Sequence, residues 1–329
     1  MKVSVDVGYG YVKACNEHGE TLHFPTIIKK KLSERIFTDN DIKYEAKING
    51  SIYYIGELAL EKKGSRSWGN DKSINADTDN YVGLCVHLLT KKEENNVNLM
   101  LGLPYNYYLN KEIREKISEE IKERVFYTTI DNESKSTSIE KVSVYPQGIG
   151  AYFNNLFDIN GKPKNNAMSI SKALMIDIGY RTVDVVAFSS RDNKLILVDS
   201  DSFSLDEKGV INVVTYVTNE IKDEYNAKMT DIEDILQNSD GILETRHATY
   251  DLKPFESEGY RVLASEIVEE LNTRLHGNIN DYKNIFITGG GAKKMFPFLK
   301  NNYDNIQLQE DYVFSNAKGY LAIESLEEA

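Results

Sequence analysis

Two stretches of this chain, residues 3–14 and 174–188, carry residue types that suit the binding of a phosphate group and its metal counter-ion. Each stretch has a β-rich run, an aspartate, a glycine-led turn and a second β-rich run. A carboxylate can hold Mg²⁺ through the waters that this ion gives up reluctantly, and glycines let backbone N–H groups approach an anion. The two aspartates, Asp6 and Asp177, are 171 residues apart in a chain of 329 residues.

Both stretches predict hairpins, because β-branched residues favour strands and a glycine-led turn separates them. The first turn holds Gly8 and Gly10, and Lys13 on the outgoing strand can reach the same anion; the second turn runs from Gly179 to Thr182. Taken alone, the first turn could equally be a tight hairpin whose glycines serve only geometry. One copy at the start of each half predicts two related lobes, with one aspartate-bearing turn from each directed into a shared cleft.

Strands and helices alternate through the rest of the first half. We expect strands at residues 2–7, 11–16, 21–28, 52–55 and 97–102, helices at 81–90 and 110–124, and paired strands at 126–130 and 139–144 across a polar turn at 131–138. Asn110 is placed to cap the helix at 110–124, where three isoleucines recur every four residues. Residues 64–80 predict a long exposed loop, in which Trp68 is either an interface residue or part of a local cluster.

Residues 145–157 predict a strand-to-helix junction. Pro146 suits the first turn of a helix, while Gly148 and Gly150 indicate close backbone packing. Gln147 lies at this junction, where its amide could orient a water molecule; the alternative is a glutamine that caps the helix. Residues 158–171, with glycine, proline and asparagine, predict the linker between the halves.

The second half predicts a further loop that can approach a ligand. We expect a strand at 195–200, a helix opening at 207–209, a small insertion at 231–250, an amphipathic helix at 258–275, a strand and three glycines at 284–291, and a helix at 315–327. Glycines at the end of a strand let the backbone approach a flat or anionic ligand, and the helix N-terminus that follows adds positive potential.

Composition excludes several classes of function. The net charge of −12 disfavours direct nucleic-acid binding through a broad basic face, although Lys29–Lys31 could form a local basic patch. Two cysteines, Cys15 and Cys85, argue against a disulfide framework and fit a reducing cytoplasm. The sequence opens directly on a predicted strand, so we expect no signal peptide, and no apolar run is long enough to predict a membrane span.

The joint order of these motifs resembles that of the actin-like ATPase superfamily, which also includes sugar kinases and heat-shock chaperone ATPases. The order is an Asp-Gly turn, a strand-to-helix glutamine, a second Asp-Gly turn and three glycines. The resemblance is nearest to the bacterial ParM-like, plasmid-segregation branch, through residues 101–104 and 289–297. It implies an α/β fold of two actin-like, ribonuclease-H-like lobes. Residues 1–158, with a returning helix at 312–329, would form domain I, and residues 159–311 would form domain II with a small subdomain near 228–257.

The resemblance also implies the site. ATP or GTP would be bound with Mg²⁺, which Asp6 and Asp177 would hold, and Gln147 and Asp177 would be the catalytic residues. Many plasmid-segregation relatives have glutamate where Gln147 stands, whereas glutamine resembles conventional actin. The nucleotide would be contacted by Gly8, Tyr9, Gly10, Tyr11, Lys13, Gly179, Tyr180, Arg181, Thr182, Glu207, Lys208, Gly289, Gly290, Gly291 and Ala292.

Three functions follow from this resemblance. The first is a cytoplasmic ATPase that self-associates into filaments and positions plasmid DNA through a DNA-binding adaptor protein, with no direct contact to nucleic acid or membrane. The second is a small-molecule kinase of the sugar or acetate kinase type, which needs an additional aspartate as base; none stands out, and Asp184 and Asp201 stay open as candidates. The third is a chaperone or divisome ATPase, for which the sequence predicts neither a peptide-binding domain nor the terminal amphipathic helix of membrane-attached relatives.

Overall fold

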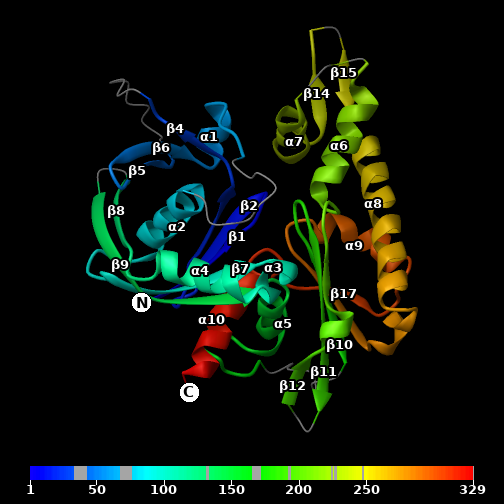
Figure 1. Cartoon of the computed structure of the whole chain (residues 1–329). Helices are drawn as coiled ribbons and strands as arrows, with labels where there is room; N and C mark the ends of the chain where they lie inside the picture. Colours follow the sequence, from blue (N-terminus) through cyan, green and yellow to red (C-terminus); the bar gives the residue numbers. More distant parts are fainter. Residues whose placement is uncertain are drawn as a thin grey trace. The chain divides into compact units, whose positions relative to one another are not determined.

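The computed structural model describes residues 1–32, 43–66, 76–130, 133–164, 172–191, 194–223, 225, 228–246 and 248–328. The chain divides into two compact units (Figure 1). Unit 1 comprises Met1–Ser169 and Val313–Ala329, and unit 2 comprises Ile170–Tyr312. The chain therefore leaves unit 1, builds unit 2 from one continuous segment, and returns to unit 1.

Unit 1 is built on a sheet whose described strands run in the order β3-β2-β1-β7-β9-β8-β5-β6-β4. Its central strands are parallel, since β1 pairs with β7 and β7 with β9, while the first hairpin is antiparallel. The strands are β1 (Lys2–Val7), β2 (Tyr11–Asn16), β3 (Thr21–Pro25), β4 (Ile28–Lys30), β5 (Glu45–Ile48), β6 (Ser51–Ile55), β7 (Asn96–Leu103), β8 (Val125–Ile130) and β9 (Glu133–Pro146). The helices are α1 (Glu57–Glu61), α2 (Ala76–Leu89), α3 (Tyr105–Leu109), α4 (Lys111–Ile121), α5 (Ile149–Leu156) and α10 (Ser315–Glu327).

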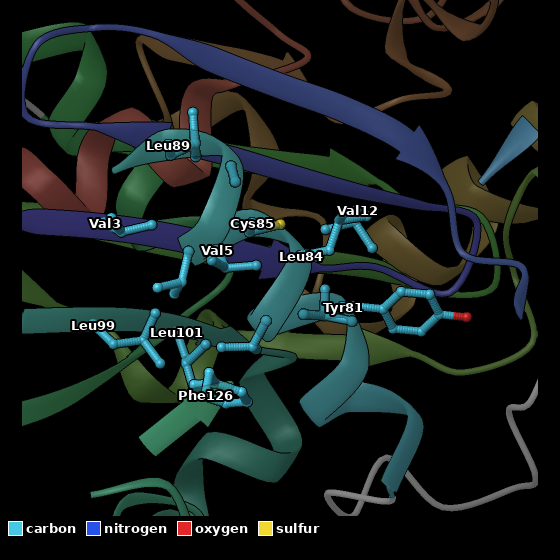
Figure 2. Packing of buried hydrophobic residues seen from close by; sticks show 14 of the residues in the cluster. Val3, Val5, Val12, Tyr81, Leu84, Cys85, Leu89, Leu99, Leu101 and Phe126 are labelled. Atoms are coloured by element: carbon cyan, nitrogen blue, oxygen red, sulfur yellow. The ribbon is translucent and has the colours of Figure 1, made fainter. Parts of the chain in front are cut away.

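Side chains on the central strands alternate between two buried faces, as the two-residue period of a strand requires. Val3 and Val5 of β1 and Leu99 and Leu101 of β7 belong to the core on the side of α2. Figure 2 shows Leu84, Cys85 and Leu89 of α2 packed over these residues. Met100, between Leu99 and Leu101, belongs instead to the core on the side of α10. Covering both faces of the sheet fixes the register of β1, and so the place of Asp6 at its end.

Helices α5 and α10 cross so closely that their contact requires glycine. A Cβ at Gly319 would lie 1.7 Å from the carbonyl oxygen of Gly150. A Cβ at Gly102 of β7 would lie 2.5 Å from the hydroxyl of Tyr320, whose ring is fully buried. The prediction that Gly150 marks close backbone packing is therefore confirmed.

Several predicted boundaries in unit 1 are correct and others are wrong. The first hairpin has the predicted bounds, and Asn110 caps α4 by accepting hydrogen bonds from the N–H groups of Glu112 and Ile113. The predicted strand at 21–28 is two strands: β3 ends at Pro25, the chain bends at Thr26, and β4 begins at Ile28. Residues 76–80 form the first turn of α2 and do not belong to a loop.

Two further corrections concern the strand that leads to Gln147. The predicted polar turn at 131–138 is mostly strand, since β9 starts at Glu133 and its polar residues up to Ser138 pair with β8. Pro146 does not start a helix; it ends β9 opposite Leu103, and Gly148 has a φ of 84°, so that α5 begins only at Ile149. Gln147 therefore lies on a short non-helical link at the end of a central strand.

Unit 2 repeats the hairpin-and-parallel-strand arrangement. Its sheet runs in the order β12-β11-β10-β16-β17, with β13 paired to β11. The strands are β10 (Ala173–Ile178), β11 (Val183–Arg191), β12 (Lys194–Leu197), β13 (Phe203–Leu205), β16 (Asn284–Thr288) and β17 (Ile306–Leu308). The predicted strand at 195–200 ends at Leu197, and a short 3₁₀ helix, η1 (Asp199–Asp201), follows it.

The helices of unit 2 are divided between its main core and a small subdomain. Helices α6 (Val210–Ile221), α8 (Lys253–Arg274) and α9 (Ala292–Lys300) contribute buried residues to the core beside β10 and β16. The small subdomain comprises α7 (Met229–Asn238), β14 (Ile242–Glu244) and β15 (Thr249–Asp251), and it packs on α6 through a separate apolar cluster. No helix within the described ranges is both long enough and apolar enough to cross a bilayer.

A buried carboxylate on α10 fastens this helix to β9. Glu324 is fully buried, accepts a hydrogen bond from the Tyr145 hydroxyl at 2.7 Å and pairs with Lys141. Burial by itself raises the pKa of Glu324, but hydrogen bonds from Lys141, Tyr145 and Ser143 outweigh burial and hold this pKa below its ordinary value of 4.5. Because the folded state depresses the pKa, the contact stabilises unit 1 at neutral pH and is lost as the pH falls through the folded-state pKa.

We predict that Glu324→Gln lowers the free energy of unfolding at neutral pH by about 2 kcal/mol, because a charge-assisted hydrogen bond is lost. The deficit should shrink in acid, where the wild-type carboxylate is itself protonated. Chemical denaturation followed by circular dichroism across a pH series measures both effects. The control is Glu115→Gln in an exposed pair on α4, which should change stability by less than about 0.5 kcal/mol. A loss of stability that does not vary with pH would contradict a stabilising role for the ionised Glu324 carboxylate.

Candidate functional site

The first turn places a buried carboxylate beside a cation and an amide. Asp6, at the end of β1, is 2% exposed, and Lys13 is its cross-strand partner on β2. The ammonium nitrogen of Lys13 lies 3.6 Å from one carboxylate oxygen of Asp6, and the side-chain amide of Gln147 donates to the other oxygen at 2.6 Å. Unit 1 therefore brings together three of the predicted site residues, Asp6, Lys13 and Gln147.

The carbonyl groups of this turn are all held on one side. Thr26 bonds the carbonyl of Gly8 through its hydroxyl and that of Gly10 through its N–H, at 2.8 and 2.9 Å. The guanidinium of Arg66 donates to the carbonyls of Tyr9 and Gly10, at 3.3 and 2.6 Å. In a trans peptide the C=O and the next N–H point in opposite directions. The N–H groups of Tyr9, Gly10 and Tyr11 are thus directed away from Thr26 and Arg66, as an anion-binding turn requires.

The second turn has the same internal geometry. The N–H of Gly179 donates to the carbonyl of Thr182 at 2.9 Å, as that of Gly8 donates to the carbonyl of Tyr11 at 3.1 Å. A Cβ would lie 2.8 Å from a carbonyl oxygen at Gly179 and 2.7 Å at Gly8, so both turns need glycine at this position. The predicted repeat of the two hairpins is therefore confirmed, and it includes this hydrogen bond within each turn.

Helix α6 binds the carbonyl groups of the second turn, as Thr26 and Arg66 bind those of the first. The N–H groups of Val210 and Ile211, in the first turn of α6, donate to the carbonyls of Gly179 and Tyr180 at 3.2 and 2.8 Å. Gly209 permits this approach, since a Cβ there would lie 2.4 Å from the carbonyl oxygen of Tyr180. The N–H groups that follow these two carbonyls are accordingly directed away from α6.

The two turns differ in charge. The cross-strand partner of Asp6 is Lys13, whereas the partner of Asp177 is Asp184. Asp184 is 2% exposed and accepts hydrogen bonds from the hydroxyls of Ser204 and Thr182. The first turn therefore carries a cation that the second lacks at the equivalent position.

The three glycines after β16 form a loop with one open side. Gly289 has a φ of 89°, and a Cβ there would lie 2.2 Å from a carboxylate oxygen of Asp177. A Cβ at Gly291 would meet Val210 and Ile178 at 2.6 and 2.7 Å, while a Cβ at Gly290 would meet nothing within 4 Å. Gly289 and Gly291 thus pack the loop against β10, and Gly290 leaves space beside it. Ala292 then begins α9.

Gln147 is not a helix cap. The N–H groups of Gly148 and Ala151, at the start of α5, donate to the side-chain oxygen of Asn316 at 3.0 and 3.1 Å, so that α10 supplies the cap. The amide of Gln147 is consequently available to Asp6, and the interpretation of this residue as a capping glutamine is wrong. Whether Gln147 orients water stays a prediction.

Three other predicted contact residues of unit 2 form ion pairs. Arg181 in the second turn is 3.7 Å from Glu207, which has a φ of 60°. Lys208 pairs with Glu266 of α8 at 2.6 Å. Their predicted contact with a nucleotide stays a prediction.

Two residues that hold the first turn, Thr26 and Arg66, are not among those predicted from the sequence. Arg66 stood in a segment predicted to be an exposed loop, yet Ser65 beside it forms a β-bridge with Ile28. The only sequence signal was a single arginine among polar residues, 56 positions from the carbonyl that it binds. Trp68 and the rest of residues 67–75 lie outside the described residues.

Each unit, taken by itself, offers groups that suit part of a magnesium-bound nucleoside phosphate. In unit 1 the first turn directs N–H groups outward and Lys13 adds a cation. In unit 2 the second turn does the same with its backbone, and the loop at Gly290 leaves room for a ligand. The described residues contain no group of three or more His, Cys, Asp or Glu side chains arranged to hold a metal ion. Single carboxylates such as Asp6 and Asp177 suit Mg²⁺, which keeps several waters and binds through one or two carboxylates together with phosphate oxygens.

Two family descriptions match consecutive parts of the chain. Residues 4–150 match the N-terminal domain of actin-like proteins, and residues 175–301 match the C-terminal domain of the archaeal actin homologue group described as MreB-like. The two matches begin just before Asp6 and Asp177, and together they span most of both units. A comparison with curated protein sequences finds no significant match.

Solved structures of the same fold extend over the whole chain. A non-polymerisable quadruple mutant of pCBH ParM has a TM-score of 0.85 at 22% identity, covering 99% of each chain. A 15-stranded ParM filament from Clostridium botulinum has a TM-score of 0.83 at 21% identity, also covering 99% of each chain. An archaeal actin homologue in complex with ADP has a TM-score of 0.75 at 19% identity, covering 100% of this chain and 99% of the other.

The fold and the repeated turns define a two-lobed α/β protein of the actin type, as predicted. The chain belongs to the family of actin-like proteins, and within it the fold is that of the ParM-like members.

We predict that Gly289→Ala disturbs the glycine loop of unit 2, because a side chain at this left-handed position would collide with the Asp177 carboxylate. The melting temperature of the nucleotide-free protein should fall by about 5 °C or more. Gly290→Ala is the matched control, since its Cβ meets no atom and should leave that temperature within about 2 °C. Equal melting temperatures for the two variants would show that the packing at Gly289 is unimportant.

Proposed function

We propose that this protein is an ATPase that assembles into filaments in a nucleotide-dependent manner. In this proposal both turns bind the phosphates of one ATP or GTP, and Asp6 and Asp177 hold its Mg²⁺ through water. The bound metal would neutralise phosphate charge during cleavage. The observation that carries the proposal is the equivalence of the two turns, each with a carboxylate before it and its carbonyls tied back by the surrounding fold.

Gln147 is the residue that we assign to the hydrolytic water. Its neutral amide is 7% exposed and already donates to Asp6, so its orientation is fixed on the same carboxylate that would hold the metal waters. A neutral amide can act by orienting water alone, without accepting a full proton. Asp177 is the second residue assigned to catalysis, through its position at the end of β10 beside Gly289.

The cellular role that we propose is the segregation of plasmid DNA in the cytoplasm through an adaptor protein. Support comes from the ParM likeness, which includes a filament structure and spans 99% of the chain. A net charge of −12 repels a phosphate backbone, so contact with DNA would require a basic adaptor.

Neither candidate base for a small-molecule kinase supports that alternative. The carboxylate of Asp184 is buried and accepts hydrogen bonds from Ser204 and Thr182, and Asp201 accepts one from the Tyr282 hydroxyl. A base for phosphoryl transfer needs access to an acceptor hydroxyl. We therefore retain the filament-forming ATPase as the proposed function.

Assembly is tested by light scattering, pelleting and negative-stain imaging at a few tens of micromolar protein, the order at which micromolar association is detectable. We expect polymer with ATP or GTP and Mg²⁺, and much less with ADP or without nucleotide. Asp6→Asn should weaken Mg²⁺-dependent nucleotide binding by about 10- to 100-fold, because it removes a carboxylate that orients the metal waters. Glu115→Gln is the control with unaltered assembly. Wild-type protein that stays monomeric with every nucleotide would refute the proposal.

A second test concerns Gln147. Gln147→Ala should slow phosphate release from assembled protein by about 100-fold, because the attacking water loses its orientation. Nucleotide affinity should stay within about threefold of the wild type, and polymer should persist longer. A parallel loss of affinity would instead assign Gln147 to holding Asp6, and unchanged phosphate release would remove it from the reaction.

A further inference from the structure

The second phosphate turn is attached to the small subdomain through Tyr180. The carbonyl of Tyr180 accepts the N–H of Ile211 on α6, which fixes its backbone. Its hydroxyl donates to a carboxylate oxygen of Glu233 on α7 at 2.9 Å, across 53 positions of sequence. One residue of the turn is thus fixed by two different helices, one in the main core and one in the subdomain.

Glu233 is itself held firmly in place. Its side chain is 6% exposed, and its second oxygen accepts the amide of Gln237, one helical turn further along α7, at 3.4 Å. Its neighbour Ile232 is fully buried in the apolar cluster that joins α7 to Val214 and Val217 of α6. A shift of α7 would therefore move the acceptor of the Tyr180 hydroxyl.

We propose that Glu233 is a positioning residue for nucleotide binding, acting on the second turn through the Tyr180 hydroxyl. The proposal rests on the proposed nucleotide-binding function. Because the turn and the subdomain share a hydrogen bond, the free energy of nucleotide binding at the turn depends on the folding of the subdomain. The coupling is reciprocal, so the stability of the subdomain also depends on nucleotide binding. The subdomain holds the turn in its binding conformation, and a nucleotide bound at the turn protects α7 from local unfolding.

The charge of Glu233 allows the role of its hydrogen bond to be tested separately from the role of its charge. A buried carboxylate is costly to leave without a hydrogen-bond donor. The Tyr180 hydroxyl supplies a donor from the turn itself. Tyr180→Phe removes this hydroxyl and so takes one donor away from the buried carboxylate. Glu233→Gln removes the charge but keeps an oxygen that can accept the hydrogen bond. The two substitutions are therefore expected to have different effects on nucleotide affinity.

The experiment measures the affinity of the full chain for a fluorescent ATP analogue with Mg²⁺. Tyr180→Phe and Glu233→Ala should each weaken binding by about tenfold, the size of one hydrogen bond to a charged group. The double variant should be no weaker than either single variant, because both remove the same contact. Glu233→Gln should stay within about twofold of the wild type. Tyr225→Phe, at a 38% exposed position after α6, is the matched control and should have no effect.

Hydrogen exchange separates this coupling from a purely structural role. In wild type, nucleotide should slow amide exchange in α7, and in Tyr180→Phe this nucleotide-induced protection should be lost. Affinities within twofold of the wild type, or additive losses in the double variant, would overturn the inference. If the wild type binds no nucleotide, the proposed function fails, and exchange in the nucleotide-free proteins still decides whether Tyr180 restrains α7.

Discussion

The fixed opposition of C=O and N–H within each peptide unit is the constraint on which both turns depend. A turn can offer N–H groups to an anion only if the rest of the fold binds its carbonyls on the other side. Unit 1 meets this requirement with Thr26 and Arg66, and unit 2 with the first N–H groups of α6. Different groups thus hold the same backbone geometry in the two turns. What the two turns share is the orientation of their peptide groups, and the side chains that fix this orientation differ.

The two hairpins differ in the residue that faces the aspartate. Lys13 faces Asp6 across the first hairpin, while Asp184 faces Asp177 across the second and is satisfied by hydroxyl groups. The first turn therefore has a cation directly opposite its aspartate, and the second turn has none at that position. In unit 1 the amide of Gln147 also reaches Asp6, and Asn316 at the start of α10 accepts the N–H of Gly148 just before α5.

Sequence alone predicted the parts of this structure that depend on local patterns. The first hairpin, the capping of α4 by Asn110, the bounds of α10 and the two-lobed fold follow from β-branched runs, cap residues and the order of motifs. The start of α5 was misplaced because the left-handed Gly148 overrode the preference of Pro146 for a first helical turn. Arg66, Asn316 and Glu233 could not be assigned, since each acts on backbone or side-chain groups more than 50 positions away.

The discontinuity of unit 1 has a consequence for how the protein forms in the cell. The glycines of α5 and β7 leave room for Tyr320 and for the backbone of α10, and these residues follow the whole of unit 2 in the chain. During synthesis on the ribosome, unit 2 is therefore complete before unit 1 can close its second core. A nascent chain that stops before residue 313 exposes the apolar face around Met100, which makes it a substrate for chaperones or proteases.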